Sequence, residues 1–298
     1  MLISVGEPII ACERVRQADG KIARRGPHAS GAPAIFAYVA AGLGTPTAFI
    51  GGVGADANGA LFKAELARSG ADPAAVHTDP AAPTATVMIH YDQSGGRGFD
   101  FALADSAAAR LPESALGDYP ERATWFHCSG SALQVGGDLA ATTMSALTRA
   151  KAAGARVSLD PNIRQELLTA AGVALLRRAL ALADAVFPSE DELEVLGITA
   201  DALSEGGVLV VQTMAADGAL ARLGSRSWRQ PALAAPQAVV DTDGAGDTFA
   251  GAFVAAAMAG LEPGQCLRAA SKVVAQAIAV EGPTTVDLSR RQWSELVA

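Results

Sequence analysis

Short apolar runs alternate with longer amphipathic runs along most of the chain. The short runs have the length of buried strands, and the longer runs carry apolar residues at helical spacing. This alternation predicts an α/β fold with a parallel or mostly parallel sheet and helices on both faces. The expected strands cover 2–5, 47–50, 124–128, 156–159, 185–187, 208–212, 219–223, 227–229 and 238–240; the expected helices cover 34–43, 57–69, 139–153, 165–183, 190–196, 249–260, 264–280 and 289–297.

The pattern changes between residues 84 and 103. Two strand-like segments, 84–91 and 99–102, flank a glycine-rich stretch, which predicts a β-hairpin. Residues 13–30 are polar and charged, and Gly26-Pro27-His28 is typical of a loop. We expect the hairpin and part of 9–30 to form a small sheet that projects from a single domain spanning 1–298. Its exposed edge could pair with a second copy of the chain and give a homodimer.

Composition and charge narrow the class of protein. The chain has 298 residues, half of them hydrophobic, and a formal net charge of −8 without a block of Lys or Arg. A large core is therefore expected, and a nucleic-acid partner is not. Cys12, Cys128 and Cys266 lie far apart, which favours a reducing compartment. The N-terminus lacks a basic region, and no segment approaches the roughly 18 uncharged apolar residues that span a membrane, so we expect a cytoplasmic protein without a membrane partner.

The stretch from Asp241 to Gly251 carries the strongest chemical signal. It joins the apolar run 238–240 to an Ala-rich, helix-like run, and Gly244 and Gly246 lie at the turn between them. Free N–H groups and the helix dipole at such a turn favour a phosphate, or the charge that develops as one is transferred. Asp247 falls in the first helical turn, so the arrangement suits phosphoryl transfer to a hydroxyl. An ordinary turn in which Asp247 caps the helix also fits these residues.

Further polar clusters follow other expected strands, and ligands in open α/β sheets bind at the carboxyl ends of strands. Asp160-Pro-Asn162-Ile-Arg164 follows one strand, and the acidic stretch 188–192 follows the next. The carboxylates could complement a helix dipole or hold Mg²⁺ through water. The stretch 213–219 lies between two strands. Each cluster could equally be an ordinary turn.

A second class of enzyme also fits part of the sequence. The run from Gly52 to Ala57 matches Gly-x-Gly-x-x-Ala, and Asp72 lies twenty residues beyond Gly52, as in a dinucleotide-binding fingerprint. A nicotinamide-dependent oxidoreductase is therefore a rival interpretation, although Asp72 stands in a polar stretch and not at a strand end. The motif GxxxxGK[ST] is absent, which excludes the P-loop NTPases, and the four histidines show no metal-binding spacing.

The run Asp-Thr-x-Gly-Ala-Gly-Asp-x-Phe-x-Gly at 241–251 resembles the C-terminal signature of the PfkB/ribokinase family of carbohydrate kinases. Other segments resemble the family in the expected order: Gly6-Glu7, Gly31-Ala-Pro33, Val-Gly-x-Asp at 53–56, the hairpin, and the clusters that follow the strands. The resemblance implies a ribokinase-like three-layer α/β/α sandwich, with a mostly parallel central sheet and a small β lid formed from about 9–30 and 84–103.

The resemblance also implies an ATP-dependent kinase that transfers the γ-phosphoryl group to a primary hydroxyl of a small sugar. Asp247 would be the general base, and Gly244, Ala245 and Gly246 would form the anion-binding turn with it. The implied sugar contacts are Glu7, Gly31, Ala32, Ile35, Asn162, Arg164 and Asp247. The implied nucleotide contacts are Thr213, Ala215, Gly218, Ser189 and Gly246. Glu192 would lie in the outer shell of Mg²⁺, and Asp241 and Asp243 would bind a monovalent cation such as K⁺.

The chain departs from the family pattern mainly where the sugar binds. Ile35 stands where the family usually has Asn, and Ala11 stands where an acidic residue is common. Near the nucleotide, Ser189 replaces Asn and Ala215 replaces Gly.

These departures affect the expected substrate more than the expected reaction. The run 30–36 resembles tagatose-kinase-like members, whereas Gly6-Glu7-Pro8 resembles 2-keto-3-deoxygluconate kinases. The latter usually carry Tyr and Arg after the hairpin, where this chain has Phe-Ala-Leu at 101–103. We therefore expect a neutral ketohexose such as tagatose or fructose. A 2-keto-3-deoxygluconate kinase, a nucleoside kinase and a non-catalytic sugar or nucleotide sensor remain alternatives.

Overall fold

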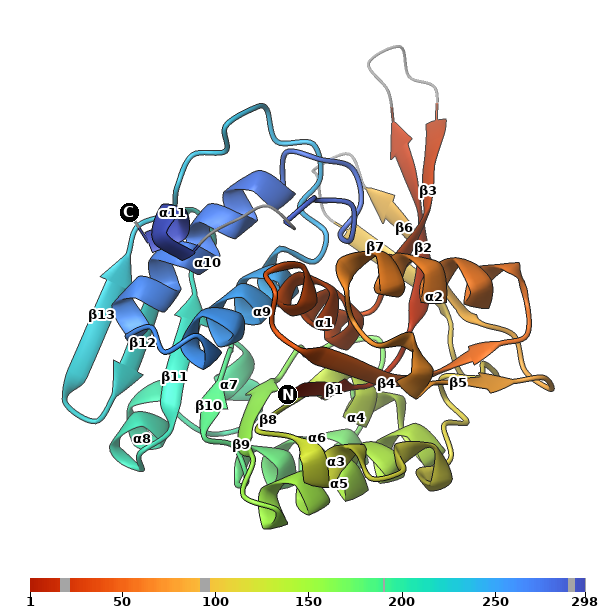
Figure 1. Ribbon diagram of the computed structural model, residues 1–298, viewed down its shortest axis with the longest axis horizontal. Helices are drawn as coiled ribbons and strands as arrows, with labels where there is room; N and C mark the ends of the chain where they lie inside the picture. The colour runs from red at the N-terminus through yellow and green to blue at the C-terminus, as the bar shows by residue number, and fades with distance from the viewer. Residues whose placement is uncertain (17–21, 92–96, 190, 289–292, 298) are drawn as a thin grey trace.

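A computed structural model describes residues 1–16, 22–91, 97–189, 191–288 and 293–297, and these form a large sheet, a small sheet and surrounding helices (Figure 1). In the described residues the large sheet has nine strands in the order β13-β12-β11-β10-β9-β8-β1-β4-β5. They are β1 (Leu2–Val5), β4 (Thr47–Gly54), β5 (Val76–Asp79), β8 (Trp125–Ser129), β9 (Arg156–Asp160), β10 (Ala185–Val186), β11 (Leu209–Thr213), β12 (Ala219–Leu223) and β13 (Arg226–Gln230).

The large sheet is mostly parallel, as the alternation predicts. Every neighbouring pair from β5 to β11 is parallel, and only the pairs β11–β12 and β12–β13 are antiparallel. The carboxyl ends of the parallel strands therefore meet at one edge, which is the edge where the polar clusters were expected.

Helices cover both faces of this sheet, which confirms the three-layer α/β/α sandwich (Figure 1). One layer contains α1 (Ala32–Gly42), α2 (Ala57–Ser69), α9 (Ala245–Met258), α10 (Pro263–Ala277) and α11 (Trp293–Val297). The other contains α3 (Tyr119–Arg122), α4 (Gly130–Val135), α5 (Gly137–Ala152), α6 (Ala170–Leu180), α7 (Glu192–Val195) and α8 (Ala200–Glu205). Side-chain alternation in β1 joins the layers: Ile3 and Val5 pack toward one core, and Leu2 packs toward the other.

The small sheet projects from one end of the molecule, with strand order β3-β2-β6-β7 (Figure 1). It consists of β2 (Ile9–Arg16), β3 (Ile22–Ser30), β6 (Ala85–Tyr91) and β7 (Arg97–Ala102). The predicted hairpin is confirmed, although most of its turn, 92–96, lies outside the described residues. The loop expected at 26–28 is wrong: this segment continues β3, because β2 supplies an antiparallel partner that pairs Ala11 with His28.

The turn expected at residues 51–56 is also wrong for residues 51–54. Strand β4 continues through Gly54 and pairs with β5, a strand that the apolar pattern did not predict. The glycines serve close packing here, since a Cβ on Gly52 would lie 2.3 Å from the carbonyl oxygen of Ala107. The Gly-x-Gly-x-x-Ala match therefore begins inside a paired strand and not in a turn that could cradle a pyrophosphate, which removes the basis of the oxidoreductase interpretation.

The run 238–240 is not a strand. Residues 231–240 are largely exposed, Val239 by 57% and Val240 by 41%, and the structure describes them outside any helix or strand. The backbone N–H of Val240 donates instead to the carbonyl oxygen of Ile278 at the end of α10, at 2.8 Å. The helix expected at 165–183 is shorter than predicted and begins at Ala170, after the Asp160–Arg164 loop.

In the described part of the chain, no helix is long and apolar enough to cross a membrane. Of the expected helices 190–196 and 289–297, residues 190 and 289–292 lie outside the described ranges; α7 and α11 form the remainder.

Helix α9 packs closely on α1 at Gly251. A Cβ on Gly251 would lie 2.6 Å from the carbonyl oxygen of Phe36 and 3.2 Å from Cβ of Val39. We predict that Gly251→Val lowers the free energy of unfolding by about 1–3 kcal/mol, because the added side chain overpacks this contact. Urea unfolding would measure the change. Gly98→Ala is the matched control, since a Cβ on this exposed glycine meets no described atom within 4 Å; equal stabilities of the two variants would contradict the close approach.

Candidate active site

A pocket lies between the small sheet and the carboxyl edge of the large sheet. Every residue that the sequence predicted as a sugar contact lines it: Glu7, Gly31, Ala32, Ile35, Asn162, Arg164 and Asp247. The other lining residues are Ile9, Ser30, Val87, Ile89, Phe99, Phe101, Leu103, Ser131, Leu167 and Asp243. The small sheet thus gives one wall that is mainly apolar, and the large sheet and α9 give one that is mainly polar.

The segments that follow adjacent strands carry the residues of the polar wall. Glu7 follows β1, Ser131 follows β8, and Asn162 and Arg164 follow β9. Because β9, β8 and β1 are neighbouring parallel strands, residues far apart in sequence end at the same place. Of the polar clusters expected after strands, the one at Asp160–Arg164 thus meets Glu7 and Ser131 at this edge.

Asp247 lies in the first turn of α9 and is buried. Burial raises the pKa of its carboxyl to about 6; the charge of Arg164 opposes this shift, while Asp243 and Glu192 add to it. Asn162 donates from Nδ2 to Oδ1 of Asp247 at 3.1 Å and fixes the carboxylate. A group with this pKa is largely ionised at neutral pH and can accept a proton.

The loop that carries Asn162 is held by the side chain of Gln134 in α4. Asn162 has a φ of 40°, a left-handed conformation that Asn tolerates better than most residues. Gln134 donates to the carbonyl oxygen of Asn162 at 3.0 Å and accepts from the backbone N–H of Arg164 at 2.8 Å. The α4 side chain of Gln134 therefore positions both residues toward the pocket.

The turn before α9 is shaped by two glycines in different ways. Gly244 has a φ of 66°, and a Cβ there would lie 2.7 Å from Cδ1 of Ile35 and 2.9 Å from Cβ of Pro283. Gly246 has open space beside it, with no described atom within 4 Å of a Cβ placed there. The N–H of Ala245 is directed to the carbonyl oxygen of Thr242 at 3.4 Å. The open side of the turn is therefore at Gly246 and Asp247, at the start of the helix where anions are favoured.

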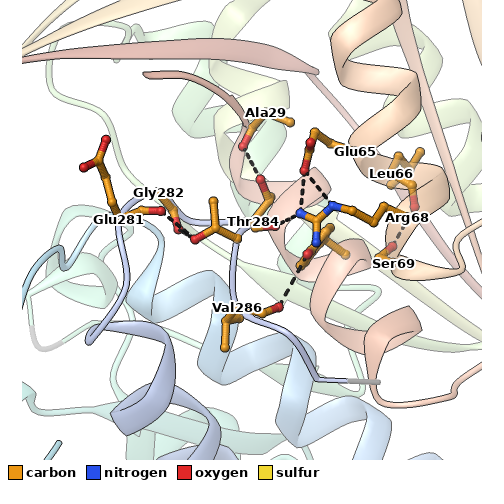
Figure 2. Close-up of polar contacts among 11 residues, drawn as sticks. Ala29, Glu65, Leu66, Arg68, Ser69, Glu281, Gly282, Thr284 and Val286 are labelled. Atoms are coloured by element: carbon orange, nitrogen blue, oxygen red, sulfur yellow. Dashed lines mark hydrogen bonds and ion pairs between the residues drawn. The ribbon is translucent and has the colours of Figure 1, made fainter. Parts of the chain in front are cut away.

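A loop after α10 supports this turn through Asp241. Asp241 accepts from the N–H of Gly282 at 3.0 Å and from the N–H of Asp243 at 2.8 Å. Figure 2 shows how the same loop is held: Arg68 of α2 donates to the carbonyl oxygen of Thr284 at 2.8 Å, and the Thr284 hydroxyl donates to the carbonyl oxygen of Ala29 at 2.9 Å. Three distant parts of the chain thus fix the position of Asp241.

Comparison with known proteins now adds to this geometry. The model of the pfkB family of carbohydrate kinases matches residues 1–290. The chain belongs to this family. It is 38% identical over 246 residues to a fructokinase of Klebsiella pneumoniae, covering 78% of this chain and 76% of that protein. It is 29% identical over 310 residues to a 2-dehydro-3-deoxygluconokinase of Thermoproteus tenax, covering 99% and 94%.

A solved structure agrees with the ribokinase-like fold. Fructokinase from Vibrio cholerae, in a form with bound fructose, ADP and calcium ion, superimposes with a TM-score of 0.81 at 26% identity. The match covers 96% of this chain and 95% of that one. The family resemblance and the fold class predicted from the sequence are therefore confirmed.

In this carbohydrate kinase the five predicted nucleotide residues do not line the pocket. Ser189, Thr213, Ala215 and Gly218 lie at or after the ends of β10 and β11, and Gly246 lies in the first turn of α9. Thr213 ends β11, and Gly218 has a φ of 92° and packs against the carbonyl oxygen of Gln230. Ala215 has a φ of 45°, a conformation that suits glycine better. This backbone conformation explains why the family usually has Gly at this position, and Ala215 adopts it with strain.

The carboxylates fit a divalent cation held mainly by phosphate oxygens and water. In the described residues no group of three or more acidic, His or Cys side chains could ligate a metal directly. Glu192 accepts from the N–H groups of Ile163 at 2.6 Å and Ser189 at 2.8 Å. Burial and the charges of Glu192 and Asp247 raise the pKa of Asp160. Such crowding of carboxylates suits a cation beside them.

Sequence reasoning missed Ser131 and Glu13. Ser131 follows β8 just as Asn162 follows β9, so the strand-end rule could have found it. Glu13 lies in β2 and is buried against Asp241; burial and the Asp241 carboxylate raise its pKa to about 7. Its inward direction depends on a register shift between Ala11 and Glu13, which the sequence pattern does not reveal.

Strain at Ala215 can be relieved by mutation. We predict that Ala215→Gly raises the free energy of unfolding, or leaves it unchanged, because the left-handed conformation costs an L-residue about 1 kcal/mol that offsets the entropy cost of glycine. Ala216→Gly is the matched control and should be destabilising by about 0.5–1 kcal/mol. Thermal unfolding measures both, and equal destabilisation would contradict the strained conformation.

Proposed function

We propose that this protein is an ATP-dependent sugar kinase that phosphorylates a primary hydroxyl of a neutral ketohexose such as fructose or tagatose. The observation that carries the proposal is Asp247: its buried carboxylate lines the sugar-side pocket and also belongs to the open turn at the start of α9. A proton acceptor and an anion-binding turn are thereby adjacent. The fructokinases among the relatives support a ketohexose.

The chemistry follows from this adjacency. The primary hydroxyl oxygen of the sugar forms a bond to the γ-phosphorus of ATP as the bond to the β–γ bridging oxygen breaks. The hydroxyl proton passes to Asp247, and the products are a sugar phosphate and ADP. The N–H groups of Gly246 and Asp247 stabilise charge on the transferring group, while Ala245 contributes less because its N–H is directed to Thr242. A loose transition state requires positioning more than a strong base.

Asp160 and Glu192 would hold Mg²⁺ through water near the phosphates, where the ion supplies charge neutralisation. Glu192 also links the loops after β9 and β10, so it fixes the positions of Asn162 and Ser189 relative to each other. Asp241 and Asp243 would place backbone oxygens around a monovalent cation such as K⁺. Thr213, Ala215, Gly218 and Ser189 would border the nucleotide.

The small sheet would act as a lid over the sugar, because its buried apolar residues form the wall that faces the polar floor. Excluding water in this way limits hydrolysis of ATP. Its exposed edges could also join two copies of the chain in a homodimer, which the molecular mass in solution would reveal.

A 2-keto-3-deoxygluconate kinase is the second candidate, and Arg164 is the observation that favours it. Its guanidinium lines the pocket and lies 5.5 Å from the Phe99 ring centroid, where it could bind a carboxylate of an acid sugar. Comparing kcat/KM for fructose, tagatose and 2-keto-3-deoxygluconate separates the candidates. ATP binding without turnover on any of them would favour a sensor.

Removing the proposed base gives the first test. We expect Asp247→Asn to lower kcat by roughly 10²–10⁴, the usual contribution of a positioned base, while ATP affinity changes only a few-fold. Sugar-dependent ADP release measures the rate, and calorimetric titration measures ATP binding. Asp191→Asn is a control in the exposed N-cap of α7, and near-normal turnover of Asp247→Asn would refute the assignment.

The pH dependence gives a second test. Because the pKa of Asp247 is raised to about 6, the base is protonated and inactive below that pH. We predict that kcat/KM falls about tenfold per pH unit below 6 and that the residual activity of Asp247→Asn lacks this limb. A wild-type profile that stays flat down to pH 5 would be inconsistent with Asp247 as the base.

A further inference from the structure

We propose that Glu7, braced by Ser131, is the residue that selects the acceptor sugar by accepting a hydrogen bond from a hydroxyl other than the one phosphorylated. This inference rests on the proposed kinase function and deepens it. It assigns to one side chain the recognition that the family usually divides between the residues at positions 11 and 35.

Glu7 is a buried carboxyl with one oxygen unused. Its side chain lines the pocket and is only 3% exposed. Oε1 accepts a hydrogen bond from the Ser131 hydroxyl, which in turn lies 2.8 Å from the Ser129 hydroxyl. Oε2 has no hydrogen-bond partner among the described residues. A buried acceptor without a partner is unfavourable, so a ligand hydroxyl that reaches it is bound more strongly.

The surrounding charges place Glu7 near the reacting end of the pocket. Burial raises its pKa to about 7, while Arg164 lowers it and Asp247 raises it. Both charged residues line the same pocket, so the carboxyl faces the space between them. A sugar whose primary hydroxyl meets Asp247 therefore has its next hydroxyls within the neighbourhood of Glu7.

The two positions whose side chains usually bind sugar hydroxyls in this family, 35 and 11, carry apolar side chains here. Ile35 is 2% exposed, and its Cδ1 packs against Gly244. Ala11 is equally buried, in the core of the small sheet beside Ile9 and Val87.

The apolar wall offers no replacement. It is made by Val87, Ile89, Phe99, Phe101 and Leu103, which present no hydrogen-bonding groups from their side chains. Recognition of hydroxyls must come from the polar floor, where Asn162 and Asp247 are already joined to each other. Two floor acceptors are buried and have no hydrogen-bond partner among the described residues, Oε2 of Glu7 and Oδ1 of Asn162. The ionised carboxylate of Glu7 is the stronger acceptor of the two, and the Ser131 hydroxyl supports it.

The experiment compares a phosphorylated sugar with its singly deoxygenated analogues. Wild-type kcat/KM should fall at least about 100-fold for the analogue that lacks the selected hydroxyl, because a site built to bind a hydroxyl rejects its absence strongly. In Glu7→Ala this ratio should fall to about threefold or less, with KM for ATP within twofold of wild type. Glu7→Gln should lie between them and serves if the Ala variant does not fold.

The matched control is Glu113→Gln. Glu113 also accepts a hydrogen bond from a serine hydroxyl, that of Ser145, but it does not line the pocket. Its variant should keep the wild-type ratio between sugar and analogue. Ser131→Ala should raise KM for the sugar about tenfold without changing which analogue is rejected.

The outcomes separate the inference from the proposed function. Full discrimination in the Glu7 variants of an active kinase overturns the role of Glu7 and leaves the kinase intact. Absence of sugar phosphorylation by the wild type overturns the proposed function, and calorimetry then decides on Glu7. Sugar binding that Glu7→Ala abolishes and Glu113→Gln preserves supports the selection role, whereas sugar binding unaffected by Glu7→Ala, or no binding at all, overturns it.

Discussion

The burial of several carboxylates around one guanidinium is the constraint on which the site depends. Asp247, Glu7 and Asp160 are all removed from water, and each has its pKa raised by burial. Arg164 is the cation that lowers all three. Without a bound ligand, this cluster lowers the stability of the fold. Cations or hydroxyl donors that bind beside the carboxylates offset part of that cost. The surrounding fold must therefore hold the cluster together against its own repulsion.

The rest of the structure supplies that restraint. Parallel strands bring Glu7 and Asn162 to one edge, and α9 brings Asp247 from a segment more than 80 residues later in the chain. Gln134 and Glu192 bind backbone groups of the loop after β9, and the loop after α10 binds Asp241. The restraints are mainly hydrogen bonds to backbone groups, which fix the loops. Glu192 is itself a carboxylate, and its charge adds to the raised pKa of Asp160 and Asp247.

The sequence predicted the sandwich and most of the polar floor, because periodicity and strand-end position are local properties. The pattern failed where tertiary context decides. Residues 51–54 contain glycines that suit a turn, yet Ala107 packs against them and β5 pairs with them. Residues 238–240 look like a strand, yet the N–H of Val240 binds the carbonyl oxygen of Ile278 at the end of α10. Ser131 and Glu13 gain their importance from partners more than 100 residues away in the chain, which no local pattern encodes.

The contact between Ile35 and Gly244 links two properties that enzymes often vary separately. The side chain at position 35 touches both the acceptor pocket and the turn that precedes α9. A side chain larger than Ile35 at this position would press on the turn before α9. The acceptor pocket and the phosphate side of the site therefore cannot be reshaped independently of each other through position 35.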